Sequence, residues 1–391
     1  MPHAPESPTA GLLPADAHAA FDRPFVDRAA AAALALLPGV GPVRWRALIT
    51  RARGDGARAA VMHGTPTAAW TRALADARRL LDAEAADTVA AIPGDSAYPR
   101  ALLDLPDAPP LLWIRGRADA LAVKPAVALV GTRHNSSAGA HAARRLVTSL
   151  GHTGACVVSG MARGIDGVVH DAALAAALPT VAVLATGVDV PYPAQHRRLY
   201  ARIVEAGAVV SEQPPGTTAN PGAFPRRNRI IAALADCTVV VEAGDRSGAL
   251  ITADVALDLG RTVAAVPGPI DAAASAGTNA LLRDGAHVLA HVDDLAPLLT
   301  LPTARPASLP PRERPRRSPV SAGKPAAPTR APLALDGDAL TLWHALVEPA
   351  PDADVVAARS GLSARRCAAA LASLEIQGAV TTELTGAIRR L

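Results

Sequence analysis

Cysteine and aromatic residues are scarce in this chain of 391 residues, which contains three cysteines and 3% aromatic residues. The cysteines form no CxxC pair, so the sequence offers neither a disulfide framework nor a zinc motif. Cys156 and Cys237 lie in strand-like apolar runs and Cys367 lies in a helical pattern, so we expect buried, reduced thiols. Because 50% of the residues are hydrophobic and few are aromatic, we expect a core of alanine, valine and leucine.

Long apolar runs are absent as well, and none could span a bilayer. The first residues show no basic segment followed by an apolar one, so we expect no signal peptide, a cytoplasmic location and no membrane contact. The net charge of +4 has a local origin, because residues 301–335 hold seven basic residues and one acidic residue. The rest of the chain then carries −2, so binding of nucleic acid would have to depend on local clusters of charge.

Changes in composition divide the chain into five parts. They are a disordered N-terminus (1–28), a helical domain (29–93), an extended Rossmann-like domain (94–300), a linker rich in proline and arginine (301–335) and a winged helix (336–391). In the helical domain, LPGVGP at 37–42 resembles a helix-hairpin-helix or SAM-like turn, but a plain turn between packed helices is the favoured interpretation. A proline-rich connector at 94–116 leads into the main domain.

The main domain alternates short β-branched runs with helical patterns. The predicted strands are residues 126–131, 155–160, 180–186, 208–212, 237–243, 262–268 and 286–290. Continuous apolar runs of this length are typical of strands that helices cover on both faces. The predicted fold class is therefore α/β, a Rossmann-like parallel sheet with a helical N-terminal domain and a C-terminal winged helix. Such sheets bind ligands beyond the carboxyl ends of their strands.

Two of the turns that follow these strands have features of an anion site. After the first strand, Arg133 stands beside Thr132 and Ser136 at the start of a helix, where backbone amides and a guanidinium can bind an anion. A tight turn with a surface arginine is the alternative, and the missing GxGxxG pattern argues against a dinucleotide. After the second strand, SGMARGIDGVVH contains the candidate residues Ser159, Gly160 and Arg163.

Asp166 and His170 in the same segment lie one helical turn apart. The pair could exchange protons or bind a metal, but no third ligand or nucleophile accompanies it. Structural hydrogen bonds are the favoured interpretation, and we expect no metal and no cofactor.

Two further turns carry basic and small residues. FPRRNR places Arg226, Arg227 and Arg229 around Asn228, and guanidiniums at such density favour a shared anion over a solvated face. In EAGDRSGALITA, Ser247 and Gly248 open a helix, with Thr252 and Ala253 one turn later, which leaves room for a backbone or a phosphate. The Gly-Thr-Asn turn at 277–279 caps another helix and fits a structural role as well.

Taken in order, these motifs resemble the DNA-processing protein A family, also called DprA or Smf. The resemblance rests on GTR, SGMARGIDGVVHDAAL, TVAVLATGVDVPYPAQHRRL, SEQPPG, FPRRNRIIAALA, VVVEAGDRSGALITADVALDLGRTVAAVPG and GTNALLRDGA. It covers residues 102–289 specifically and the two ends of the chain more loosely. The sequence departs from the family pattern at Thr132, where GTR replaces GSR, and at Ala235, where the family often has serine.

The resemblance implies a protein that binds single-stranded DNA, protects incoming DNA and loads the RecA recombinase onto it in natural transformation and DNA recombination. It also implies a homodimer formed through the Rossmann-like domain. The residues that would line a positively charged DNA pocket are Arg133, Ser159, Gly160, Arg163, Arg226, Arg227, Asn228 and Arg229. The winged-helix segment has seven acidic residues against five basic ones, so we expect an accessory role for it rather than DNA binding of its own.

The leading hypothesis is a DNA-binding protein without catalytic activity, in which arginines neutralise phosphates without reading the base sequence. A nucleotide phosphoribohydrolase, which would use the same pocket for a nucleoside monophosphate, is the alternative. That class carries a PGGxGTxxE segment with a catalytic glutamate, and the corresponding place here reads DRSGALITADVA. A scaffold that binds only proteins is a third possibility.

Overall fold

The computed structural model describes residues 21, 25, 27–82, 87–300, 337–346, 350, 353–376, 379–382 and 388–390. The chain divides into two compact units, Met1–Ser308 and Leu309–Leu391. The predicted linker, and all but a few residues of the predicted disordered N-terminus, lie outside the described residues.

The first unit begins with four helices, α1 (Arg28–Leu36), α2 (Pro42–Arg51), α3 (Gly56–Met62) and α4 (Thr67–Asp82). Side-chain oxygens of Asp27 and Asp55 accept hydrogen bonds from the first turns of α1 and α3, and Pro42 begins α2, so each start is encoded locally. Trp45 is buried, and its indole nitrogen donates to the carbonyl of Ala31 at 2.9 Å, which fixes α2 against α1.

A nine-stranded sheet forms the centre of the first unit, in the order β1-β2-β6-β5-β4-β3-β7-β8-β9. The bounds are β1 (Thr88–Ala91), β2 (Leu112–Gly116), β3 (Ala126–Gly131), β4 (Cys156–Ser159), β5 (Thr180–Val183), β6 (Ala208–Ser211), β7 (Cys237–Glu242), β8 (Thr262–Ala265) and β9 (His287–Val288). The seven strands from β3 to β9 are parallel to one another and match the seven predicted strands. The prediction of a Rossmann-like parallel sheet is therefore confirmed.

The two remaining strands correct the sequence analysis. β1 lies in a stretch predicted to be helical, and β2 lies in the stretch predicted to be a connector. They pair antiparallel, and β2 adds antiparallel to β6 at the edge of the parallel sheet. β1 was missed because its alanine-rich sequence continues the hydrophobic pattern of α4 without a visible change. β2 was missed because the prolines before it suggested a connector, although Trp113 and Ile114 belong to a buried strand.

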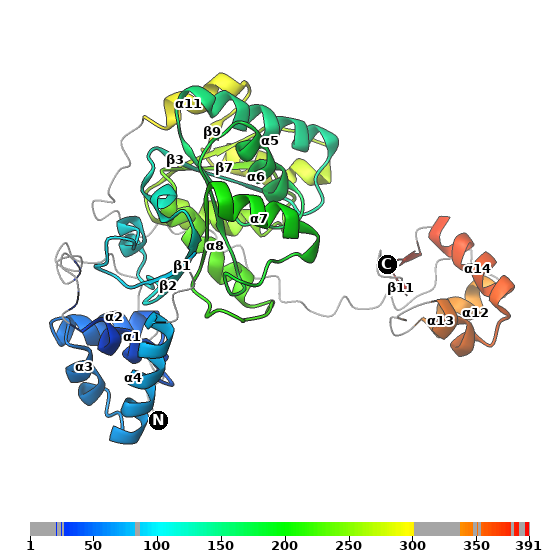
Figure 1. Ribbon diagram of the computed structural model, residues 1–391. Helices are drawn as coiled ribbons and strands as arrows, with labels where there is room; N and C mark the ends of the chain where they lie inside the picture. The colour runs from blue at the N-terminus through cyan, green and yellow to red at the C-terminus, as the bar shows by residue number, and fades with distance from the viewer. Residues whose placement is uncertain are drawn as a thin grey trace, which may run out of the picture. The chain divides into compact units, whose positions relative to one another are not determined.

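Helices cover both faces of the sheet (Figure 1). They are α5 (Ser137–Ser149), α6 (Ile165–Ala175), α7 (Arg197–Ala206), α8 (Ala223–Leu234), α9 (Ala249–Asp258), α10 (Ala276–Arg283) and α11 (Leu295–Leu298). Alternate residues of β3 face opposite sides: Val127 and Leu129 pack in one cluster with α5 and α6, while Ala128 and Val130 pack in another with α8 and α9. All three cysteines are free and buried, as predicted.

The order of the strands reverses beside β3. From β3 the chain adds β4, β5 and β6 on one side and then returns to place β7 on the other. The helices that follow β3 and β7 therefore diverge to opposite faces, and a crevice opens at the carboxyl ends of these two strands.

The second unit contains α12 (Gly337–Ala345), α13 (Ala353–Ser360) and α14 (Ala364–Ile376), followed by the antiparallel pair β10 (Val380–Thr382) and β11 (Ile388–Arg390). Leu342, Trp343, Leu374 and Ile388 are buried together in its core. Three helices and a hairpin confirm the predicted winged helix. In the described parts of both units, no helix has both the length and the apolar character that crossing a membrane requires.

Candidate functional site

A pocket of about 490 Å³ lies at the carboxyl ends of β3 and β7, where the order of the strands reverses. Four segments line it: the loop after β3, the loop after β4, the first turns of α8 and the connection from β7 into α9. The lining residues are Val130, Gly131, Thr132, Arg133, His134, Ala162, Asp166, Phe224, Pro225, Arg227, Asn228, Ile231, Gly244, Arg246, Ser247, Gly248, Ala249, Ile251 and Thr252. Four of the predicted turns therefore meet at one place, whereas the Gly-Thr-Asn turn at 277–279 does not line the pocket.

Arg227 is the buried cation of this pocket, with 4% of its surface exposed. Its Nη1 donates to the carbonyl oxygen of Gly160 at 2.6 Å and also to that of Val183. Its Nε is buried without a hydrogen-bond partner among the described residues, and no carboxylate there forms an ion pair with it. A Cβ at Gly160 would lie 2.4 Å from Arg227 Nη1, so only glycine fits beneath this guanidinium.

Burial lowers the pKa of Arg227 to about 10. The Asp166 carboxylate opposes this shift, and the nearby charge of Arg133 adds to it. The guanidinium therefore keeps its charge at neutral pH. It satisfies part of its hydrogen-bonding capacity with neutral carbonyls, which leaves its positive charge available to an anion in the pocket.

Asp166 and His170 have structural hydrogen bonds, as the sequence favoured. The Asp166 carboxylate accepts from the amides of Gly160 at 3.2 Å and Ala162 at 3.3 Å, which holds the turn after β4. Burial raises the pKa of Asp166, although Arg227 and the backbone donors oppose the shift. His170 Nδ1 lies 2.8 Å from the Thr180 hydroxyl, and burial lowers the pKa of His170 to about 3. No group of three or more potential metal ligands occurs among the described residues.

An aromatic pair stands beside the basic loop after β3. The guanidinium of Arg133 lies over the ring of Phe224, 5.2 Å from its centroid. The Phe224 and Tyr192 rings are 5.3 Å apart with a 50° angle between their planes, and Tyr192 is 38% exposed. Tyr192 and Phe224 are 32 residues apart in the sequence, and the fold brings their rings together beside the pocket.

The other predicted residues occupy three kinds of position. Ser159 is buried, and its hydroxyl donates to the carbonyl of Leu129 at 2.7 Å, so it supports the sheet beneath the pocket. Arg163 and Arg226 are exposed beside lining residues, and neither has an ion pair within the part of the chain that is described.

Asn228, Ser247 and Gly248 all line the pocket. The Asn228 side-chain amide donates to the carbonyl of Gly248 at 3.0 Å, which joins the first turns of α8 and α9.

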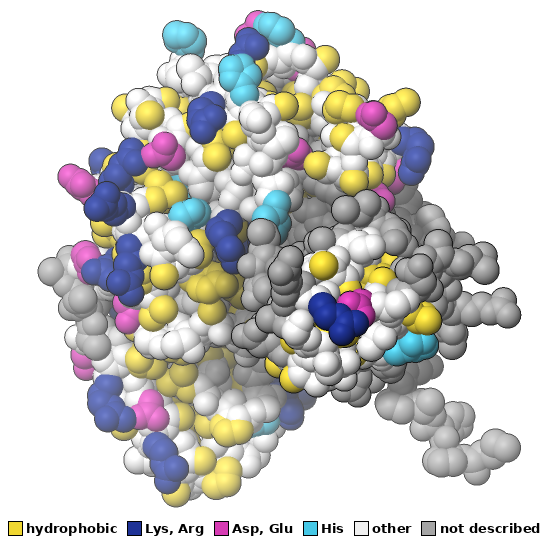
Figure 2. All heavy atoms as spheres, turned by 90° about the vertical axis from the view of Figure 1, so that its right-hand side faces the viewer, with side chains coloured by type: hydrophobic (Ala, Val, Ile, Leu, Met, Phe, Trp, Pro, Cys, Tyr) yellow, Lys and Arg dark blue, Asp and Glu magenta, His cyan; other side chains and the backbone are white. Residues whose placement is uncertain are grey.

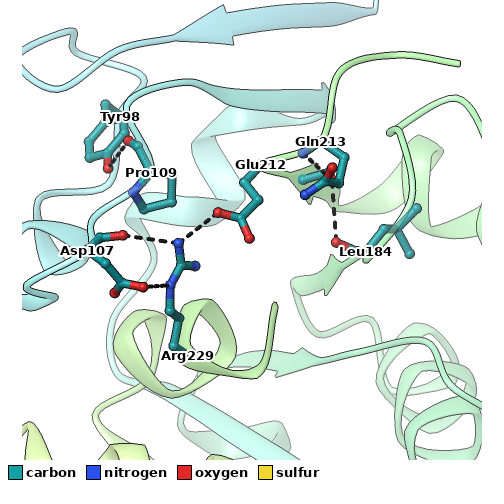
Figure 3. Close-up of polar contacts among 8 residues, drawn as sticks. Tyr98, Asp107, Pro109, Leu184, Glu212, Gln213 and Arg229 are labelled. Atoms are coloured by element: carbon teal, nitrogen blue, oxygen red, sulfur yellow. Dashed lines mark hydrogen bonds and ion pairs between the residues drawn. The ribbon is translucent and has the colours of Figure 1, made fainter. Parts of the chain in front are cut away.

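Arg229 contradicts the prediction that the arginines of FPRRNR share one anion. Its Nε donates to Asp107 Oδ2 and its Nη2 to Glu212 Oε2, both at 2.7 Å, and it does not line the pocket (Figure 3). The helical period turns Arg229 away from Arg227, toward carboxylates that lie 122 and 17 residues away in the sequence. Local sequence could not show that these acids were near.

Two basic residues of the pocket were missed. Arg246 and His134 both line it and are exposed. The signal for Arg246 was its position directly before Ser247 in the turn already singled out. On the face drawn in Figure 2, Lys and Arg side chains lie among acidic and apolar ones.

Comparison with known proteins agrees with this architecture. The chain matches the family model of the DNA recombination-mediator protein A over residues 90–300 and that of the DprA winged helix domain over residues 325–390. The chain belongs to the DNA recombination-mediator protein A family.

Two curated relatives and one solved structure illustrate the similarity within the family. The putative DNA processing protein DprA of Mycobacterium tuberculosis (strain ATCC 25618 / H37Rv) is 50% identical over 188 residues, and the match covers 48% of each chain. The DNA processing protein DprA of Streptococcus pneumoniae (strain ATCC BAA-255 / R6) is 41% identical over 201 residues, which are 51% of this chain and 71% of the relative. An X-ray structure of DNA processing protein A from Streptococcus pneumoniae matches with a TM-score of 0.62 and 31% identity, over 69% of this chain and 97% of that one. The chain thus spans about half the length of the Mycobacterium relative.

Proposed function

We propose that the pocket and its rim bind the sugar-phosphate backbone of single-stranded DNA without reading the base sequence. One observation carries the proposal: exposed arginines without carboxylate partners surround a buried cation at the switch point of the sheet. The rim arginines are Arg133, Arg163, Arg226 and Arg246. Because none forms an ion pair among the described residues, their charge is available to phosphates.

The backbone around the pocket supports the same ligand. The helices α8 and α9 both begin at it, so their positive dipole ends face the space that an anion would fill. Phe224 and Tyr192 add ring surface beside Arg133, and stacking on aromatic rings tolerates any base. A single strand, whose bases are unpaired, can use both the cations and the rings.

Membership of the family supports a proposed role in DNA metabolism. A recombination mediator that covers a single strand through its backbone can protect the strand and pass it to a recombinase. On this proposal the chain loads RecA onto DNA, acts in natural transformation as a homodimer formed through the Rossmann-like domain, and binds partners through the winged helix. A RecA strand-exchange assay on pre-bound DNA tests the loading of RecA, and light scattering of the purified protein tests the homodimer.

Salt dependence tests the DNA proposal. Each phosphate neutralised on a single strand contributes about −0.7 to the slope of log K against log salt, so four rim arginines predict a slope of about −3. We expect Arg133→Ala and Arg226→Ala each to weaken binding of an oligothymidine and to reduce the slope by about 0.7. Arg78→Ala, which removes an exposed charge from α4, is the matched control and should change neither value.

Fluorescence anisotropy with labelled oligothymidine at five salt concentrations gives both quantities. Binding that is indifferent to salt, or rim variants that behave like Arg78→Ala, would overturn the proposed mechanism.

A further inference from the structure

Arg229 belongs to a buried cluster behind α8 that the DNA proposal does not use. The Arg229 cluster consists of Arg229, Glu212 at the end of β6 and Asp107 in the segment before β2 (Figure 3). Arg229 Nη2 also donates to the backbone carbonyl of Asp107 at 3.0 Å. One guanidinium thus joins a helix, the end of a parallel strand and the N-terminal edge of the domain.

The guanidinium of this cluster is enclosed and paired with two carboxylates. The Arg229 and Glu212 side chains are each 8% exposed, and that of Asp107 is 34% exposed. Burial alone would lower the pKa of Arg229, but Glu212 and Asp107 outweigh it, so the pKa is raised. A phosphate could reach this guanidinium only by displacing two carboxylates that already bind it, so Arg229 offers no charge to DNA.

The segment that receives Arg229 is itself firmly held. The Tyr98 hydroxyl donates to the carbonyl of Pro109 at 2.8 Å, and Arg46 from α2 donates to two carbonyls in between. Arg261, which precedes β8, forms an ion pair with Asp104 at 2.7 Å. Residues 98–109 are therefore held by an internal hydrogen bond and tied to α2 and to the start of β8, and Arg229 attaches α8 to this segment.

α8 also carries the DNA-binding groups in its preceding turns, with Phe224, Arg226 and Arg227 all within five residues of Arg229. We infer that Arg229 is a positioning residue: through Glu212 and Asp107 it sets the place of α8, and so of these three side chains, without touching DNA. This inference rests on the proposed DNA site. It predicts that an acidic residue, Glu212, is required for binding an acidic polymer.

The test compares the change in DNA affinity of two variants that each remove one negative charge. Glu212→Gln removes a negative charge near the site, as does Asp245→Asn, which changes an exposed acid next to the pocket-lining Arg246. Simple electrostatics predicts tighter binding of DNA for both variants, by about threefold for an exposed charge. Positioning predicts this gain for Asp245→Asn only, and a loss of about tenfold for Glu212→Gln, because a buried guanidinium loses a charged partner.

Hydrogen exchange distinguishes a local displacement of α8 from a loss of global stability, because a global loss would not speed exchange in α8 alone. In full-length Glu212→Gln we expect faster amide exchange in residues 223–228, with exchange in β3 unchanged. Arg229→Lys, which keeps the charge but cannot form the same fork to both acids and a carbonyl, should show the same local change and weaker binding. Should Arg229→Lys prove unable to fold, Glu212→Gln alone carries the test.

Two results would overturn the inference: tighter or unchanged binding in Glu212→Gln, or faster exchange throughout the first unit. Failure of the DNA proposal is separable, because then Arg133→Ala and Arg226→Ala would leave binding unchanged while the exchange experiment still reports on α8.

Discussion

Replacing Arg229 with alanine should cost the first unit a large part of its stability. The change strands the Glu212 carboxylate, whose side chain is 8% exposed, and removes three hydrogen bonds from the guanidinium. Removing one partner of a buried ion pair costs about 3–5 kcal/mol, because the remaining charge stays desolvated and unpaired. Since domains are stable by only about 5–15 kcal/mol, this loss is easy to measure.

Urea unfolding followed by tryptophan fluorescence is the assay. Trp343 lies in the second unit, so a Trp343→Phe background leaves Trp45, Trp70 and Trp113 to report on the first unit alone. We expect the transition midpoint to fall with little change in its slope, as for a variant that alters stability but not the surface exposed on unfolding.

Two other ion pairs calibrate the result. Arg261→Ala breaks the pair with Asp104, whose side chain is 36% exposed, and should cost about 1 kcal/mol because water can reach this carboxylate. Arg117→Ala breaks an exposed pair with Asp119 and should leave the midpoint unchanged.

A compensating variant separates burial of charge from loss of packing. Arg229→Met combined with Glu212→Gln leaves no unpaired charge between α8 and β6, so it should recover much of the stability that Arg229→Ala loses. This explanation is refuted if Arg229→Ala lowers the urea midpoint no more than Arg117→Ala does, or if the double variant has a lower midpoint than Arg229→Ala.

Three further changes probe the surroundings of the pocket. His170→Gln should flatten the acid limb of the stability profile. The folded pKa of about 3 lies below the ordinary 6.5, so between these values the unfolded chain binds an extra proton. The free energy of unfolding therefore decreases, by up to about 1.4 kcal/mol per pH unit, as the pH is lowered through this range. Urea midpoints from pH 7 to pH 4 check this, and an unchanged slope would count against a neutral buried imidazole. Gly160→Ala should displace the guanidinium of Arg227 and reduce both stability and DNA affinity, measured by thermal unfolding and anisotropy. Gly248→Ala meets open space at a φ of −61°, so it should preserve the unfolding temperature, and any loss of affinity would then report contact of DNA with that backbone.

The parallel sheet was predictable because burial on both faces leaves a simple trace in the sequence. Val127, Leu129 and Val130 belong to one continuous run, as strands covered by crossover helices require. The antiparallel edge was not predictable in this way, because the four residues of β1 are Thr-Val-Ala-Ala and follow an alanine-rich helix without a break in pattern. Alanine fits both periods, so its burial there depends on the partner strand β2.

The location of the pocket followed from topology, whereas the roles of its residues depended on distant partners. Carboxyl ends of parallel strands meet at one edge, so the turns at Arg133 and Ser247 had to be close. The sequence could not distinguish the roles of Arg227 and Arg229. Arg227 donates hydrogen bonds to neutral carbonyls and Arg229 donates to two carboxylates, and these acceptors come from other strands and loops. Arg227 and Arg229 are the same residue type two positions apart, and they differ in role because of contacts with residues far away in the sequence.

The charge that α8 offers to DNA is consequently smaller than its sequence suggests. Arg229 is neutralised by Glu212 and Asp107, which together carry one more charge than it does. Arg226 is exposed and Arg227 is buried without a carboxylate in contact, so the attraction from α8 depends on these two alone. The expected salt slope is therefore the shallow value of about −3 that the four rim arginines give, and not the steeper value that counting every arginine of the motifs would give.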